Sequence, residues 1–376
     1  MIAVISYSFL QEYWWIIISV LGALLVFLMF VQGGQSLIYT IGKTEQQRTM
    51  LINALGRKWE FTFTTLVTFG GAFFASFPLF YATSFGGAYW VWMAILFSFI
   101  LQAVSYEFRT KPANFLGTKT YEFFLVINGL LGTLLIGTAV GTFFNGSQFS
   151  LNDYNQVTWQ TTTRGLEAVL NFHNLALGLA VFFLSRVLAL LYFNNSIDDA
   201  EIATQTKKHL FVNAIPFLLF FLYFVIALML KKGFAYHEET MLVSMEKYKY
   251  LHNLLQMPLV LVLFLVGVVL VLWGIWTDLY RKPGKGIWFS GAGTVLTVFT
   301  LFLLAGFNNT CYYPSAFDLQ SSLNIRNSSS SEFTLRTMAV VSLIIPFVIA
   351  YIWVAWKAIN NKKIDQAEME EGSHKY

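Results

Sequence analysis

Apolar residues recur along this chain in long, nearly uninterrupted runs, and polar residues are mostly confined to the connections between them. A helical run of about 20 apolar residues crosses roughly 30 Å of hydrocarbon. The pattern predicts an all-α integral membrane protein whose 376 residues form a single polytopic membrane domain. We expect two four-helix bundles plus one peripheral helix. The nine predicted transmembrane helices lie near 14–38, 60–83, 88–106, 120–144, 170–193, 210–230, 254–277, 287–307 and 337–358.

Composition and charge agree with a membrane location. Only 12% of the residues are charged, whereas about 25% is usual in soluble domains. If the 39–59 connection is cytoplasmic, that side carries sixteen Lys and Arg residues and the opposite side seven, with Arg186 inside a span. The positive-inside rule then places the N-terminus outside and the C-terminus in the cytoplasm. The basic charge therefore reports topology, and we expect no nucleic-acid partner.

The predicted outer side carries three long connections, near 145–169, 231–253 and 308–336. The last contains the Asn327–Ser331 run, whose composition is typical of a turn or a flexible linker. Tryptophans near span ends, such as Trp14, Trp15, Trp90 and Trp273, predict aromatic belts at the membrane interfaces.

Residues able to hold a redox cofactor are scarce. Four of the five histidines fall in connections or at span ends, and only His173 is expected inside the membrane. A haem needs at least one axial ligand, and a single histidine near a helix end is more often a structural residue. The one cysteine, Cys311, excludes an internal disulfide and a multi-cysteine metal site. We therefore expect no metal or haem bound by this chain.

A second pattern favours proton transfer. Glu60 begins the second span, and Thr62, Thr64, Thr65 and Thr68 follow it. On the first span Gln32 and Gln35 share a helix face. These acid, amide and hydroxyl groups could line a file of water leading inward from the cytoplasm. Alternatively, the threonines satisfy backbone carbonyls and Glu60 interacts favourably with the helix N-terminus.

The other charges near the membrane have simpler interpretations. For Arg186, a snorkelling side chain or a salt bridge across the bundle is favoured over a substrate site. Glu107 and Arg109 are expected to pair with each other or with a neighbouring chain. Glu12 and Glu122 are expected at the membrane interface.

Several local motifs stand out along the chain. Four distinctive ones lie around the second and third spans: Ile52–Glu60, Gly70–Ala82, Phe85–Tyr89 and Tyr106–Arg109. Weaker ones toward both ends are Trp14–Trp15, Tyr313–Ser315 and Ser329–Leu335. Together these motifs resemble subunit II of the cytochrome bd quinol oxidases, most specifically over the second and third spans.

The resemblance implies a heterodimeric oxidase of the bacterial cytoplasmic (inner) membrane. Such an enzyme takes electrons from quinol and reduces oxygen to water with cytoplasmic protons. In this family haems b and d belong to subunit I. Subunit II is a scaffold that contributes part of a proton path, and small accessory subunits can join. Some members also hold a structural quinone, which makes Trp59 a candidate contact for a quinone or a lipid.

Two family motifs are altered here. The typical Trp-Asp-Gly-Asn appears as Trp59-Glu60-Phe61-Thr62, and Asp-Gly-Phe-Asp appears as Gln32-Gly33-Gly34-Gln35. Glutamine can orient water but cannot store a proton. Glu60 is thus expected to be the only ionisable relay group of this subunit, and burial is expected to raise its pKa.

Two other functions remain open. A secondary transporter would show broken helices at the membrane midplane, at corresponding places in two halves. An assembly scaffold without chemistry would give Glu60 a structural role only.

Overall fold

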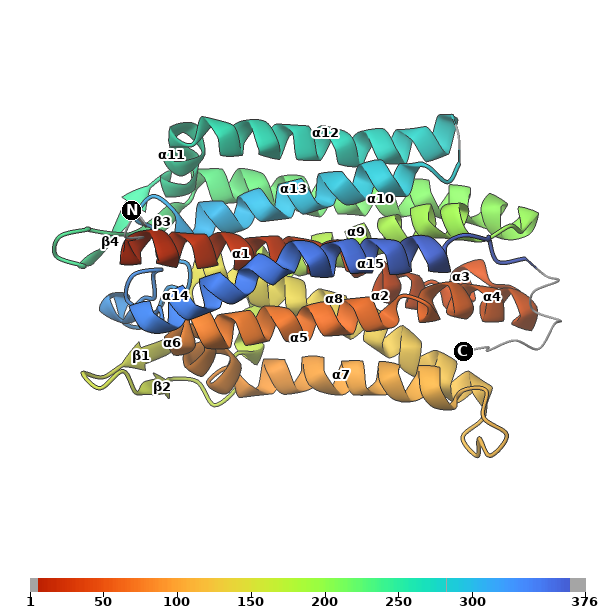
Figure 1. Cartoon of the computed structure of the whole chain (residues 1–376), viewed down its shortest axis with the longest axis horizontal. Coiled ribbons are helices and arrows are strands. Elements are labelled where there is room, and N and C mark those ends of the chain that lie inside the picture. Colours follow the sequence, from red (N-terminus) through yellow and green to blue (C-terminus); the bar gives the residue numbers. More distant parts are fainter. Residues whose placement is uncertain (1–5, 282, 366–376) are drawn as a thin grey trace.

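The computed structural model describes residues 6–281 and 283–365. Long antiparallel helices run side by side along the longest axis (Figure 1). The helices are α1 (Tyr7–Leu28), α2 (Phe30–Gln35), α3 (Ile38–Ile41), α4 (Glu45–Gly56), α5 (Trp59–Ser76), α6 (Pro78–Phe80), α7 (Tyr89–Phe108), α8 (Thr118–Asn145), α9 (Phe172–Ser196), α10 (Ala200–Leu230), α11 (Lys249–Gln256), α12 (Pro258–Tyr280), α13 (Gly286–Gly306), α14 (Glu332–Val341) and α15 (Ile345–Ile359). Short 3-10 or π segments are η1 (Tyr81–Gly86), η2 (Leu166–Leu170), η3 (Leu319–Ser321) and η4 (Ser342–Ile344).

The predicted class is confirmed. Within the described residues, eight helices are long and apolar enough to cross a membrane, or nine if one bent pair counts as a span. The bent pair joins Glu45–Ser76 to Pro78–Gly86 at an angle of 116°. A continuous helix over 60–83 is therefore wrong beyond Ser76. Proline has no N–H and disfavours helical backbone in the residue before it, so the chain turns at Phe77.

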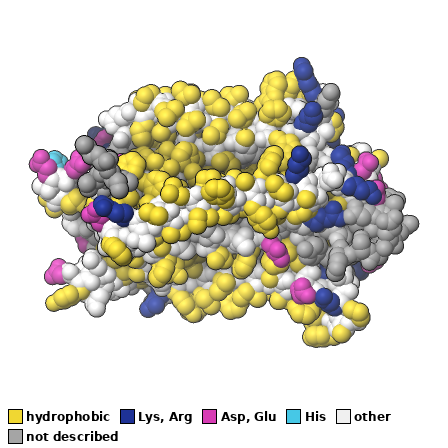
Figure 2. All heavy atoms as spheres, in the orientation of Figure 1, with side chains coloured by type: hydrophobic (Ala, Val, Ile, Leu, Met, Phe, Trp, Pro, Cys, Tyr) yellow, Lys and Arg dark blue, Asp and Glu magenta, His cyan; other side chains and the backbone are white. Residues whose placement is uncertain are grey.

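The two ends of the molecule differ in character. One end, called here the basic end, carries α3, α4 and the α7–α8, α9–α10 and α12–α13 connections, and Lys and Arg gather there on the visible face (Figure 2). The other, the hairpin end, carries two antiparallel hairpins. Strands β1 (Phe149–Leu151) and β2 (Val157–Trp159) form one, and β3 (Lys232–Tyr236) and β4 (Val243–Lys247) form the other.

Helix α9 occupies the centre of the packing. It contacts α2, α8 and α10, and 78% of its most apolar 18-residue stretch is buried. Helix α1 packs on both α5 and α13, and α8 packs on both α7 and α9, so the first four and the next four spans share one interior. The last span, 332–359, is only 6% buried and lies at the periphery, as the sequence predicts.

Two glycines let α2 enter this interior. A side-chain carbon on Gly33 would lie 2.1 Å from the Ser185 carbonyl group of α9. One on Gly129 of α8 would lie 2.5 Å from the Gln32 carbonyl oxygen of α2. Small residues allow such close backbone approach between membrane helices. Helix α2 is consequently held between α8 and α9 with all six of its residues buried.

The hairpin end corrects two predictions. Asn327–Ser331 is not a free linker, because Ser328 is 1% exposed and bonds Tyr312, while the Ser330 amide donates to the Ser76 carbonyl. Trp14 and Trp15 are core residues rather than an interfacial belt, since their indole N–H groups donate to carbonyls of Leu335 and Phe302 inside the protein. Trp90 and Trp273 are half exposed, as a belt requires.

Replacing Gly33 by Ala should separate α2 from α9. Overpacking typically costs about 1–3 kcal/mol, and here the clash is with backbone, which cannot rotate away. We expect a clear fall in the thermal unfolding midpoint of the purified protein, followed by tryptophan fluorescence. Gly71→Ala is the matched control, because nothing lies within 4 Å of its added carbon. Equal midpoints for the two variants would contradict the close packing.

Candidate functional site

A chain of buried polar side chains runs between α2, α7 and α8 in the half of the bundle toward the basic end. Its members come from neighbouring turns of each helix, so they share one face. We call this set the polar file: Gln32, Gln35, Ser98, Gln102, Tyr106 and Asn128, none of which is more than 2% exposed.

Three hydrogen bonds connect the polar file across the helices. Gln32 Nε2 donates to Gln102 Oε1 at 2.7 Å, and Gln35 Nε2 donates to the Tyr106 hydroxyl at 3.0 Å. Asn128 Nδ2 donates to Ser98 Oγ at 3.3 Å. Gln32 and Gln35 thus each bond a different partner on α7.

The hydrogen-bonding capacity of the polar file is only partly used. Four buried atoms have no hydrogen-bond partner among the described residues: Gln32 Oε1, Gln35 Oε1, Gln102 Nε2 and Asn128 Oδ1. Buried polar atoms of this kind are usually satisfied by ordered water. The arrangement therefore provides acceptors and donors for a short row of water molecules inside the subunit.

An ion cluster lies next to the polar file at the basic end. Arg109 directly follows the last residue of α7, three positions after Tyr106, and its guanidinium contacts the Glu122 carboxylate at 2.8 Å. Arg48 of α4 contacts the other Glu122 oxygen at 3.1 Å. Glu122 lies near the start of α8 and is 1% exposed, so it is buried within the subunit, where two guanidinium groups compensate its charge.

The cluster also affects Tyr39, which lies between the first two spans. Burial and the neighbouring Glu122 carboxylate raise the pKa of the Tyr39 phenol to about 12. A phenol beside a carboxylate loses its proton less readily, because the product would bring two negative charges together.

Glu60 lies apart from this interior. Glu60, Thr64 and Thr68 follow one another on the exposed face of α5. The two threonine hydroxyls donate to carbonyls of their own helix, at 2.6 Å from Glu60 O and 2.7 Å from Thr64 O. This chain does not supply the expected burial of Glu60. An acid on the outside of a membrane helix needs cover from another surface.

Trp59 connects the exposed and buried groups. Its indole stacks on Tyr106, with ring centroids 5.7 Å apart and planes 17° apart. Glu60 is the next residue, so the polar file reaches the α5 N-terminus through Gln35, Tyr106 and Trp59.

The sequence pattern did not indicate Lys58, which is fully buried with Nζ 4.1 Å from the centre of the Trp356 ring.

The remaining predicted charges occupy separate places. Glu107 pairs with Lys111 at 3.1 Å on the surface, whereas Arg109 pairs with Glu122 instead of Glu107. Arg186 lies over the Phe182 ring at 5.3 Å, and no carboxylate among the described residues forms an ion pair with it.

The described residues offer little for a metal. None of them form a group of three or more His, Cys, Asp or Glu that could hold an ion. His173 stacks on Phe224 with ring centroids 4.7 Å apart, and its Nε2 has no hydrogen-bond partner among the described residues.

Helical spacing could have revealed more of this site. Ser98, Gln102 and Tyr106 recur every fourth residue, and this period alone indicates a polar stripe on α7. Glu122 carries no such signal, because its partners come from α4 and from the end of α7. Asn128 is likewise an isolated amide in an apolar run.

Comparison with known proteins gives a consistent result. A family model described as "Cytochrome bd terminal oxidase subunit II" matches residues 10–359. A probable cytochrome oxidase subunit 2 from Haemophilus influenzae is 26% identical, with 94% of each chain covered. Cytochrome bd-I ubiquinol oxidase subunit 2 from Escherichia coli K12 is 24% identical, over 98% of this chain and 99% of that one. Among solved structures, a chain of bd oxidase from Geobacillus thermodenitrificans has the same fold, with a TM-score of 0.63 and 15% identity over 94% of this chain and 99% of that one.

Glu122→Gln should strongly destabilise the protein. Breaking a buried ion pair by removing one partner typically costs about 3–5 kcal/mol, because the other charge stays buried. Glu107→Gln removes an exposed pair and should change stability by less than about 1 kcal/mol. Thermal unfolding of both variants in one detergent provides the comparison. Similar midpoints would mean that Glu122 does not hold α4, α7 and α8 together.

Proposed function

Because this chain belongs to the cytochrome bd terminal oxidase subunit II family, it is a subunit of a membrane-bound quinol oxidase, and we propose that its own task is to deliver protons to a haem-bearing partner. The complex is an oxidoreductase of the bacterial inner membrane, and membership as subunit II implies a partner subunit. Quinol and oxygen are the substrates of the complex.

We infer that this subunit binds no haem of its own. His173 lies in the first turn of α9 with its ring packed against Phe224, as a structural residue does. We therefore assign haems b and d to the partner. Subunit II then contributes structure and proton transfer, and no electron passes through its residues.

The observation that carries the proton proposal is the polar file with its four unpartnered buried atoms. In our proposal a proton enters at the basic end beside Glu122 and moves along water held by Gln32, Gln35 and Gln102. It leaves past Tyr106 and Trp59 toward Glu60. The amides orient water and carry no charge, so Glu60 is the group that holds the proton before it passes to the partner.

The exposed face of α5 is where we place that transfer. Thr64, Thr68 and Glu60 form a polar row there, beside exposed apolar residues such as Val67 and Phe74. Apolar side chains cover most of the face shown in Figure 2, which includes α5 and α15. A partner helix on this face would bury Glu60 and separate its carboxyl group from lipid. We assign the exposed surface of α15 to the binding of small accessory subunits.

A structural quinone or lipid at Trp59 would have to approach from the partner side, because Tyr106 and Phe63 occupy the other ring contacts. The chain also contains an apolar crevice of about 240 Å³ between α9, α10, α12 and α13. Its apolar lining suits an isoprenoid or acyl tail rather than a quinone ring.

The two alternative functions receive less support. A transporter of the inverted-repeat type would have broken helices in both halves, whereas only one bent pair occurs in the described residues. A scaffold without chemistry is compatible with the threonine bonds to α5 itself, but it gives no role to the polar file.

Glu60→Gln should slow oxygen uptake by at least about tenfold while haem content and assembly stay normal, as expected for loss of a proton-transferring acid. Glu60→Asp should restore part of the rate. Glu45→Gln, an exposed acid at the start of α4 toward the same end, is the control and should leave turnover unchanged. Full turnover of a properly assembled Glu60→Gln complex would leave only the scaffold role.

Gln32→Met keeps the side-chain length but removes the amide that holds water in the polar file. We expect about tenfold slower turnover per haem, because an apolar lining disfavours a continuous row of water. Gln11→Met makes the same change at a buried amide of the hairpin end, where Gln11 bonds Ser329 at 2.6 Å. Equal rates in the two variants would remove Gln32 from the path.

A further inference from the structure

A polar cavity lies at the hairpin end, away from the polar file. Its volume is about 510 Å³, and it is enclosed by the ends of α7 and α8, the β1–β2 hairpin, η2 and the start of α9. Trp159 brings the hairpin onto this wall by donating to the Thr83 carbonyl at 3.0 Å. That contact requires Gly87, where a side-chain carbon would lie 2.0 Å from the indole nitrogen. The cavity is therefore built by specific contacts between the hairpin and the membrane helices.

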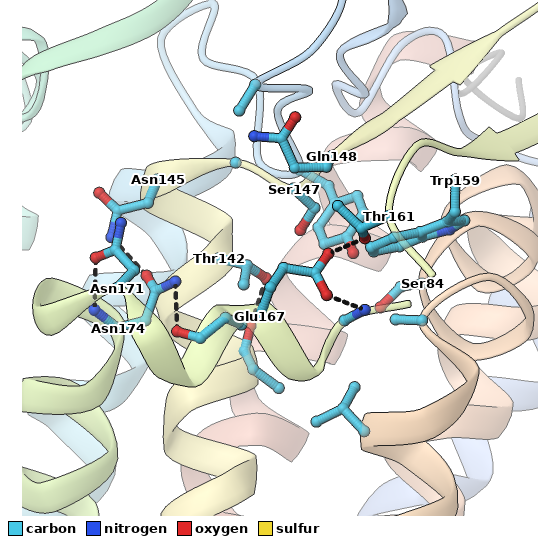
Figure 3. A pocket seen from close by; sticks show the side chains of 18 of the residues that line it. Ser84, Thr142, Asn145, Ser147, Gln148, Trp159, Thr161, Glu167, Asn171 and Asn174 are labelled. Atoms are coloured by element: carbon cyan, nitrogen blue, oxygen red, sulfur yellow. Dashed lines mark hydrogen bonds between the residues drawn. The ribbon is translucent and has the colours of Figure 1, made fainter. Parts of the chain in front are cut away.

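One carboxylate, Glu167, supplies the charge of the lining. Figure 3 shows its carboxyl group held between Thr161 and the backbone nitrogen of the η2 turn. Thr161 and Thr163 donate to separate oxygens at 2.6 Å, and the Gly165 amide donates at 2.9 Å. Partial burial alone would raise the pKa of Glu167, but these donors outweigh it and lower the pKa. The group is an anion at neutral pH.

The opposite side of the cavity carries amides. Asn145, Asn171 and Asn174 lie together there, as Figure 3 shows, and Asn145 Nδ2 donates to Asn174 Oδ1 at 2.5 Å. Lys231 stands behind them, where its Nζ donates to Asn145 and, at 2.6 Å, to the Phe144 carbonyl. The cavity thus has the Glu167 carboxylate on one side and, on the other, asparagine amides of which Asn145 is bonded to Lys231.

The aromatic lining of the cavity and the exposed apolar residues near it favour one class of ligand. Trp92, Trp159 and Tyr313 line the cavity, and aromatic faces attract ammonium groups. Leu170 lines the cavity and is 87% exposed, and the nearby residues Leu166 and Phe172 are 38% and 56% exposed. A soluble amine needs no apolar rim, whereas a lipid lays its chains along one. The hairpin end is also where the membrane spans meet the headgroup region.

We propose that this cavity binds the headgroup of a phospholipid with a primary ammonium, of the phosphatidylethanolamine class. The ammonium group lies beside Glu167 and the aromatic walls, and the phosphate lies toward Asn145 and the other amides near Lys231. The acyl chains follow the apolar rim at the start of α9. The lipid joins the β1–β2 hairpin to the membrane helices.

The test uses the purified two-subunit complex after delipidation. The complex is incubated with phosphatidylethanolamine or phosphatidylglycerol, and the lipid that remains bound is quantified by mass spectrometry. Wild type should retain phosphatidylethanolamine, and Glu167→Gln should retain at least about tenfold less, as expected for loss of one desolvated charge contact. Asp153→Asn, an exposed acid in the same hairpin, should retain as much as wild type.

A second variant distinguishes loss of lipid binding from misfolding of the η2 turn. Ala139→Leu fills the cavity from α8 without removing any hydrogen bond of Glu167, and it should also lose the lipid. Ethanolamine binding that disappears in Glu167→Gln would support ammonium recognition with a soluble amine as the ligand. Retention of phosphatidylethanolamine by both variants, or equal retention of phosphatidylglycerol by wild type, would overturn the proposal.

Discussion

The packing of this subunit toward the basic end depends on the buried carboxylate of Glu122. This carboxylate contacts Arg109 at 2.8 Å and Arg48 at 3.1 Å, and so joins three helices through one group. Charges are costly at this depth unless they are paired and hydrogen-bonded. The position of Glu122 therefore fixes where α4 and the end of α7 meet α8. Once α7 is fixed, Ser98, Gln102 and Tyr106 must face α2 and α8.

Close backbone packing allows a polar interior to exist in such an apolar protein. Because Gly33 and Gly129 carry no side chain, α2 lies directly against α9 and α8. The long amides of Gln32 and Gln35 then reach α7 without leaving the membrane interior. Their remaining hydrogen-bonding atoms can be satisfied only by small molecules such as water. The packing and the proposed proton path are thus consequences of the same short helix.

The structure separates three regions in space. The interior between α2, α7 and α8 is polar and buried. The α5 face with Glu60 is exposed. The hairpin end is ordered by hydrogen bonds among loops, and it contains the cavity that we assign to a lipid headgroup. This division suits a subunit of a larger complex, because its chemistry would be completed at a surface that only the partner can cover.

The sequence by itself determined the membrane class, the number of spans and the family, because these depend on run length, composition and local motifs such as Ile52–Glu60. It also indicated that Gln32 and Gln35 share a face, since helical periodicity is local. Tertiary structure decided which polar residues meet. Glu122 is buried because Arg48 and Arg109 arrive from other elements, and Glu60 is exposed because α5 turns it away from the bundle. Pairings of this kind depend on distances between helices, which no pattern within one helix contains.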